Sequence, residues 1–384
     1  MLVSILLAVA TAAVSIPSGP SGDAFYTPPR PLPSGIEGSI VWAQPFSGGA
    51  ALPSASKNYR MLYETLSPRG VFIAISGTLA VPNGAPPAHG WPLISWAHGT
   101  VGNAPECAPS RWTKPSVEQR MLDAFVQRGY AVAETDYEGN GTPGIHPYMV
   151  GTTLARDVSD IAVASRALVP QIGRDWVVMG HSEGGGVALA TAAFGQQLAP
   201  NLNLLGAVGY APVAYPAATL AYELHSHSPN GGLVALALMI EGFASADPRV
   251  VPSQILEPQF LPLLAELQQH CIYDLLEHSD WSTTIPATIF RPQGEDSLKA
   301  LYADLRQNEA GYFPISVPTL ILNGLSDTMV SSEGSITVAD RLRRNGTPVT
   351  FKAYLGATHA SVLAVSVNDV APWLAQRFAD VGSH

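Results

Sequence analysis

Gly180-His181-Ser182-Glu183-Gly184 decides the fold, because this G-x-S-x-G pattern joins two segments of different character. Residues 176–179 before it are apolar and suit a short buried strand, whereas residues 187–194 after it suit a helix. A serine at a strand-to-helix turn of this kind sits in a tight, strained backbone, where side chains two positions away would collide with neighbouring backbone. The context predicts a nucleophile elbow at Ser182.

Short apolar segments alternate with amphipathic segments along most of the chain. Two alternating runs flank Ser67-Pro68-Arg69-Gly70 and predict an antiparallel strand pair, and Ser116 is expected to cap the first helix after it. The later alternation predicts a mostly parallel sheet with helices on both faces. Together with the elbow serine it predicts the α/β class and the α/β-hydrolase fold. The expected strands are 57–66, 71–82, 92–97, 130–135, 176–179, 204–208, 318–322 and 349–354, and the expected helices are 116–128, 152–169, 187–194, 332–344 and 366–378.

One interval, residues 211–314, breaks this alternation and is rich in apolar residues and proline. It suits helices, such as 261–270, and predicts a helical cap over the carboxyl edge of the sheet, where open α/β sheets bind their ligands. Its apolar run 233–240 could line an acyl pocket, form a lid or pack inside the cap. The core is then split into residues 16–210 and 315–384.

The N-terminal residues predict export. Residues 2–13 are apolar and end near Ala10-Thr11-Ala12, which resembles a signal-peptidase site, so residues 1–15 are interpreted as a signal peptide. The protein is therefore expected outside the cell or in the cell envelope. Residues 16–33 are rich in proline, glycine and serine and predict an extended arm over the body.

Composition excludes several classes of function. The chain has 384 residues, of which 47% are hydrophobic and 13% charged, so it can bury a substantial core. Its net charge of −10 argues against binding nucleic acid and against electrostatic docking to anionic lipid heads. Apolar contact with a lipid surface stays open, and no obligate protein partner is predicted.

A serine nucleophile needs a base, and in this fold the chain order is serine, acid, histidine. After the cap only His359 and the C-terminal His384 remain, and His359 follows the last expected strand. Asp327 directly follows the strand 318–322, and it is preferred as the acid because its rivals Glu333 and Asp340 fall on an expected helix. The predicted catalytic residues are Ser182, Asp327 and His359.

The tetrahedral oxyanion of acyl transfer needs two N–H donors. One is expected from the backbone of Glu183, the residue after the nucleophile. The other is expected from the loop His98-Gly99-Thr100 after the strand 92–97, and the sequence leaves Gly99 and Thr100 as alternatives.

No cofactor or metal is predicted. His225 and His227 form an H-x-H pair without a third ligand, which suits polar surface better than zinc. Cys107 and Cys271 are the only cysteines, so an exported chain would have one long-range disulfide, whereas two buried thiols remain the alternative.

Further motifs resemble the secretory lipases of the LIP family, the Candida antarctica lipase A-like proteins, and their actinobacterial branch in particular. The matching stretches are Asp23-Ala24-Phe25-Tyr26-Thr27-Pro28-Pro29, Cys107-Ala108-Pro109-Ser110, and Asp136-Tyr137-Glu138-Gly139-Asn140-Gly141-Thr142 followed by His146-Pro147-Tyr148. The family often has an acidic residue where this chain has His98-Gly99-Thr100, and the second disulfide of some members has no cysteines here.

The resemblance implies an α/β-hydrolase core with a helical cap and lid, and catalysis by Ser182, Asp327 and His359 on lipid or other carboxylic esters. It also implies a Cys107–Cys271 disulfide. Two other functions remain open: a serine peptidase or amidase, for which Glu223 or Glu241 could anchor a peptide terminus, and a hydrolase fold used only for binding. Acyl transfer to an alcohol instead of water cannot be distinguished by sequence.

Overall fold

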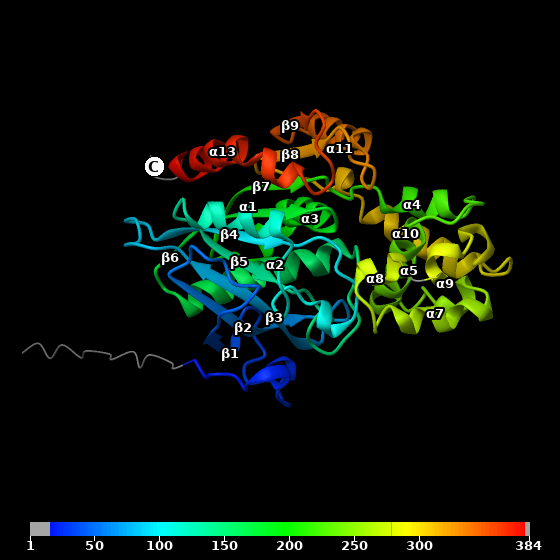
Figure 1. Ribbon diagram of the computed structural model, residues 1–384, viewed down its shortest axis with the longest axis horizontal. Coiled ribbons are helices and arrows are strands. Elements are labelled where there is room, and N and C mark those ends of the chain that lie inside the picture. The colour runs from blue at the N-terminus through cyan, green and yellow to red at the C-terminus, as the bar shows by residue number, and fades with distance from the viewer. Residues whose placement is uncertain (1–15, 278, 381–384) are drawn as a thin grey trace, which may run out of the picture.

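The computed structural model describes residues 16–277 and 279–380, so the predicted signal peptide and His384 lie outside the described residues. One mixed sheet runs through the molecule in the order β1-β2-β3-β5-β4-β6-β7-β8-β9 (Figure 1). Strands β1 to β3 and the β3–β5 pair are antiparallel, and every pair from β5 to β9 is parallel. The strands are β1 Ile40–Pro45, β2 Lys57–Leu66, β3 Phe72–Val81, β4 Trp91–Ala97, β5 Ala131–Thr135, β6 Ile172–His181, β7 Asn203–Tyr210, β8 Thr319–Gly324 and β9 Val349–Tyr354.

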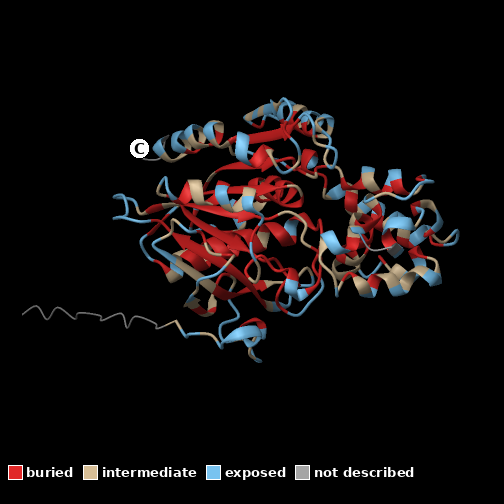
Figure 2. Ribbon diagram, viewed as in Figure 1, coloured by how far each residue is buried: buried red, intermediate tan, exposed pale blue. Residues whose placement is uncertain are grey.

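Helices cover both faces of this sheet, as predicted. One face packs against α2 (Gly151–Leu168), α3 (Glu183–Leu198) and α11 (Ser332–Arg344). The other packs against α1 (Ser116–Val126), α12 (Val362–Val365) and α13 (Val367–Asp380). With both faces covered, the central strands are buried almost throughout (Figure 2).

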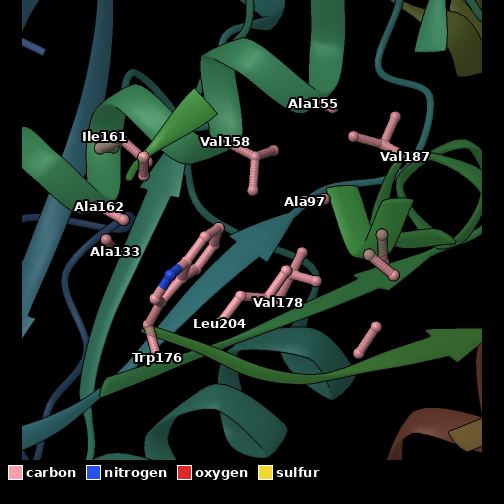
Figure 3. Packing of buried hydrophobic residues seen from close by; sticks show 14 of the residues in the cluster. Ala97, Ala133, Ala155, Val158, Ile161, Ala162, Trp176, Val178, Val187 and Leu204 are labelled. Carbon is pink, nitrogen blue, oxygen red and sulfur yellow. The ribbon is translucent and has the colours of Figure 1, made fainter. Parts of the chain in front are cut away.

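The core around β6 is close-packed about the large aromatic side chain of Trp176. Figure 3 shows the Trp176 side chain of β6 among Val158 and Ile161 of α2 and Leu204 of β7. Trp176 is fully buried, as are Val158 and Ile161. This close packing fixes β6, the strand that leads to Ser182, against α2 and β7.

The cap lies between β7 and β8 and has a hydrophobic core of its own (Figure 1). Residues 233–240 belong to its central helix and supply much of that core, with Leu236, Leu238 and Ile240 fully buried. Within the cap, Leu256 and Phe290 form an isolated antiparallel β-bridge. Cys271 of the cap takes part in a disulfide. The cap helices are α4 Pro216–Glu223, α5 Gly232–Ala246, α6 Pro252–Ile255, α7 Leu261–Glu266, α8 Ile272–Glu277, α9 Ser279–Thr283 and α10 Glu295–Gln307.

A disulfide joins the cap to the core. Cys107 lies in the connection between β4 and α1, and Cys271 immediately precedes α8. Their Cα atoms are 5.5 Å apart. Beside it the Ile272 N–H donates to the Val101 carbonyl at 2.8 Å. The predicted Cys107–Cys271 bridge is confirmed.

Four local expectations are corrected by the structure. Strand β1 went unpredicted, because it is a short edge strand that ends in Pro45, a residue that counts against a strand. Ser116 is the first helical residue and not the cap, since Pro115 occupies the N-cap position. The arm 16–33 contains a 3₁₀ turn at Gly22–Tyr26, because Phe25 is buried against Trp42. The helix expected at 261–270 ends at Glu266.

Among the described residues no helix is both long enough and apolar enough to cross a membrane.

Candidate active site

Ser182 stands at the turn from β6 to α3 in a strained conformation, with φ 59° and ψ −118°. Its N–H donates to the Tyr210 carbonyl of β7 at 2.9 Å. A Cβ atom at Gly180 would lie 2.0 Å from the Gly184 carbonyl oxygen, and one at Gly184 would lie 1.9 Å from the Ala97 carbonyl oxygen. Both glycines are therefore needed, since no other residue leaves room for the turn.

His359 and Asp327 meet at the carboxyl edge of the sheet. His359 follows β9 and Asp327 follows β8, and their Nδ1 and Oδ2 atoms are 2.8 Å apart. The Asp327 carboxylate also accepts the N–H groups of Met329 and Val330, both at 2.9 Å. Burial acts to raise the pKa of Asp327, but the hydrogen bonds from His359, Val330 and Met329 outweigh it and hold that pKa below its usual value. Since the carboxylate accepts from Nδ1, Nε2 of His359 is left as the basic nitrogen.

The rival carboxylates lie elsewhere. Glu333 is exposed in the first turn of α11, where its N–H is capped by Ser331. Asp340 pairs with Arg343 on the exposed side of the same helix. Of these three acids, Asp327 is the one bonded to His359.

His181, which sequence reasoning left without a role, supports the loop of His359. Its Nε2 donates to the His359 carbonyl at 2.8 Å, and the two rings lie 4.4 Å apart. Burial, with a contribution from the nearby His359, lowers the pKa of His181 to about 3, so its ring is neutral at ordinary pH. The only sequence signal for it was its place beside Ser182 in the elbow.

The predicted oxyanion loop lies against the nucleophile. A Cβ atom at Gly99 would lie 3.4 Å from Ser182 Cβ, so this backbone approaches the serine closely. The His98 ring donates through Nδ1 to the Gly99 carbonyl at 2.7 Å, and the Thr100 hydroxyl is bonded to the Tyr148 hydroxyl at 2.9 Å. These bonds orient the Gly99–Thr100 peptide. Glu183 begins α3, so its N–H has no acceptor one turn earlier within that helix.

Behind the elbow the Glu183 side chain forms a buried pair with His146. Glu183 Oε1 and His146 Nε2 are 2.8 Å apart, and both side chains are 2% exposed or less. His146 Nδ1 donates to the Glu138 carbonyl at 3.1 Å. Because a carbonyl and a carboxylate both accept, a proton must lie between Glu183 and His146, held on one or the other. The sequence marked His146 only as part of a family motif.

One cavity of about 1020 Å³ brings these groups together. Ser182, His359, Gly99 and Thr100 line it from the core. Its cap side is mainly apolar and includes Ala235 and Met239 of α5, so two positions of the run 233–240 reach the cavity while the run as a whole packs inside the cap. The remaining cap residues of its wall include Ala218, Thr219, Tyr222, Ile272, Tyr273 and Leu276.

Glu223 and Glu241 do not line this cavity. Glu223 accepts from the Asn230 side chain at 3.0 Å, and Glu241 accepts from Gln268 at 2.9 Å and from Asn103 at 3.4 Å. Both carboxylates are thus occupied within the protein.

The His225 ring is bonded through Nδ1 to the Ala221 carbonyl at 3.0 Å. Within the described part of the chain, no three histidine, cysteine, aspartate or glutamate side chains gather as metal ligands would.

The sheet order, the strand–turn–helix around Ser182 and the helical insertion before β8 define an α/β-hydrolase fold. Residues 112–383, more than half of the chain, match the family described as secretory lipase. The protein belongs to the secretory lipase family.

Comparison with solved structures agrees with the fold. Over 92% of this chain and 85% of the other, the fold matches Candida antarctica lipase A in its closed state, with TM-score 0.75 and 16% identity. A variant of the rice cell wall degrading esterase LipA from Xanthomonas oryzae matches with TM-score 0.72 and 17% identity, over 89% of this chain and all of that one.

Two relatives in sequence differ in their described activity. A secreted triacylglycerol lipase of Malassezia globosa is 24% identical, over 93% of this chain and 81% of its own length. A probable inactive lipase of Mycobacterium tuberculosis is 25% identical, over 94% of this chain and 82% of its own length.

Proposed function

We propose that the protein is a secreted serine hydrolase that cleaves carboxylic esters of lipids or other hydrophobic molecules. The observation that carries the proposal is the Asp327–His359 hydrogen bond, which leaves a basic ring nitrogen in the wall of the same cavity as Ser182. Membership of the secretory lipase family supports the type of reaction. The apolar wall of the cavity suits a hydrophobic substrate.

In the proposed reaction, His359 Nε2 takes the proton of Ser182 as its Oγ attacks the ester carbonyl carbon. The Glu183 N–H and one amide of the Gly99–Thr100 segment stabilise the oxyanion. The tetrahedral intermediate collapses, and the alcohol leaves with the proton from His359. Water then attacks the acyl carbon of the acyl-enzyme and gives a proton to His359. As this second tetrahedral intermediate collapses, His359 returns the proton to Ser182 Oγ, which leaves as the free hydroxyl while the acid is released. Asp327 holds the imidazole and stabilises its charged form throughout.

Hydrolysis rate against acyl chain length tests the proposal. Purified protein is assayed on p-nitrophenyl esters of increasing chain length, with Ser182→Ala as the control. We expect saturable hydrolysis that falls to background in Ser182→Ala. Equal hydrolysis by the two proteins would contradict the proposal.

A peptidase or amidase with the same catalytic residues is the first alternative. It lacks support from Glu223 and Glu241, whose carboxylates are bonded inside the cap. Aminoacyl anilides added to the same panel decide between the two, and a preference for anilides over esters would favour the peptidase.

A non-catalytic binding protein is the second alternative, and the probable inactive relative from Mycobacterium tuberculosis is the reason to consider it. The hydrogen-bonded Asp327 and His359, and the strained backbone of Ser182, argue for catalysis. A fluorophosphonate probe should label the protein at Ser182, whereas a folded protein that resists labelling would favour binding alone.

Export from the cell is part of the proposal. The family is a secretory one, and residues 1–15 have the pattern of a signal peptide. N-terminal sequencing of protein recovered from culture medium should find a start shortly after Ala12. Recovery of full-length chain starting at Met1, only from inside cells, would contradict export.

A further inference from the structure

Charge in the cavity wall is concentrated at one place. Of all the described aspartate, glutamate, lysine and arginine residues, only Lys114 and Glu118 line the cavity that contains Ser182. They lie four positions apart, Lys114 just before α1 and Glu118 in its first turn, and apolar Val117 and Leu363 also line the cavity. Val117 and Leu363 belong to the hydrophobic cluster on the face of the sheet that α1 and α12 cover.

The segment that carries these two residues is held firmly. Ser110 donates to both carboxylate oxygens of Asp136, through its N–H at 2.8 Å and through its hydroxyl. The Lys114 N–H donates to the Gly49 carbonyl at 3.4 Å, and the disulfide at Cys107 lies a few residues earlier. Lys114 and Glu118 therefore face the cavity from a preorganised wall.

Glu118 keeps one oxygen available for a ligand. Its Oε1 accepts from the Trp96 indole at 3.2 Å, whereas Oε2 has no hydrogen-bond partner among the described residues. The side chain is half-buried and borders the cavity, so Oε2 can be reached from it. Lys114 is different, because its ammonium is buried and already bonded to the Glu134 carboxylate.

The local charges favour a neutral ligand group. Lys114 opposes a cationic group, and the carboxyl groups of Glu118 and Glu134 oppose an anionic one. Burial, and next the charge of Glu134, raise the pKa of Glu118 to about 7, so near neutral pH this carboxyl can donate or accept a hydrogen bond. A hydroxyl group can form a hydrogen bond with Glu118 Oε2, and the rest of an otherwise apolar chain can pack against the apolar walls of the cavity.

We propose that Glu118 binds a hydroxyl group of the substrate, so that the enzyme prefers esters whose hydrophobic chain carries a hydroxyl group away from the scissile bond. The inference rests on the proposed ester hydrolysis and adds a substrate class to it. Glu118 acts here as a specificity residue and takes no part in bond cleavage.

Matched pairs of esters test the inference. Each pair has the same chain length, with or without a terminal hydroxyl group, and both acyl-side pairs (p-nitrophenyl esters) and alcohol-side pairs (followed by acid release) are assayed. For at least one pair we expect wild-type kcat/KM to favour the hydroxylated ester by about tenfold, the discrimination one hydrogen bond to a buried polar group provides. Glu118→Leu should remove the preference, and Glu118→Gln, which keeps a polar atom at the same place, should retain most of it.

The control is Glu106→Leu, the same substitution at an exposed glutamate outside the cavity wall, which should leave the preference unchanged. Thermal melts of each variant exclude unfolding as the cause, and the Gln variant carries the test if the Leu variant does not fold. If wild type and Glu118→Leu hydrolyse esters but show the same ratio of kcat/KM between hydroxylated and plain esters, the inference is wrong while the proposed function stands. If the wild-type protein shows no Ser182-dependent hydrolysis of any ester, both are wrong.

Discussion

At the scale of single residues, the strain at Ser182 and the hydrogen bonds around it define the candidate site. A non-glycine residue at φ 59° has an energetic cost that the surrounding structure must offset. Here the Tyr210 carbonyl holds the serine N–H, and two glycines admit the close approach of Ala97 and Gly184. The Ser182 hydroxyl is thereby held at the carboxyl edge of the sheet before any substrate binds.

The first prediction concerns Asp327→Asn. An amide that turns its NH₂ group toward His359 would favour the tautomer with the proton on Nε2, which cannot accept from Ser182. We expect kcat to fall by about 10⁴-fold with a small change in KM, as assessed by steady-state kinetics on p-nitrophenyl esters. Glu333→Gln, a change to the rejected rival acid, should retain wild-type kcat. A mild effect of Asp327→Asn would remove this residue from the proposed mechanism.

A second prediction at this scale addresses the His146–Glu183 pair. His146→Leu leaves the Glu183 carboxyl buried without its partner, and breaking a buried pair costs about 3–5 kcal/mol. Urea unfolding should show a loss of this size. The double variant His146→Leu/Glu183→Gln should lose clearly less than the sum of the two single variants, and strict additivity would show that the pair contributes no coupling.

At the scale of elements, the parallel half of the sheet could be predicted from sequence because its strands alternate with amphipathic helices, and all of them except the edge strand β9 are mostly buried. Strand β9 and helix α11 were predicted at their observed bounds. The approach of His359 to Asp327 agrees with the strand placement, because both follow neighbouring parallel strands, β8 and β9.

Other features depend on contacts between distant residues and had no local signal. Strand β1 is an edge strand whose pairing with β2 contains a register shift. The roles of His181, His146 and Glu118 depend on the His359 carbonyl, the Glu183 carboxylate and the Trp96 indole, which the fold brings to them from other segments. A sequence pattern reports periodicity and turns, but it does not report such pairings.

The disulfide gives a prediction at this scale. It closes a loop with a sequence separation of 164 residues, for which the loop-entropy model gives a stabilisation of about 5 kcal/mol. The Cys107→Ser/Cys271→Ser variant should lose a large part of this in urea unfolding, and mild reduction of the wild type should reproduce the loss. Unchanged stability in both would show that contacts between cap and core compensate fully.

At the scale of the whole molecule, buried acids determine how stability depends on pH. Burial, and next the charge of Glu138, raise the pKa of Asp157 to about 8, and burial raises the pKa of Glu138 to about 7. In the unfolded chain these groups ionise near pH ~4. The folded protein therefore holds protons that the unfolded chain has lost, and stability falls as pH rises from about 4 to about 8.

Asp327 has the opposite sign, because its lowered pKa gives stability that is lost as the pH falls below about 4. We therefore expect the free energy of unfolding to be larger near pH ~5 than near pH ~8 in urea titrations. Asp157→Asn, which is neutral at every pH, should flatten this slope. A slope that rises toward pH ~8, or that Asp157→Asn leaves unchanged, would contradict the assignment.

The tether at Cys107 and Cys271 also restricts how the molecule can open. A domain that is joined to another by two connecting segments can rotate as a rigid body about the axis through those two segments. Here the cap has its connecting segments after β7 and before β8, and the disulfide adds a third attachment beside the Val101–Ile272 hydrogen bond. A swing of the whole cap would pull on the segment that follows Gly99 and Thr100 and would distort the wall facing Ser182. We therefore expect substrate to enter through local movement within the cap, while the segment of Gly99 and Thr100 keeps its place beside Ser182.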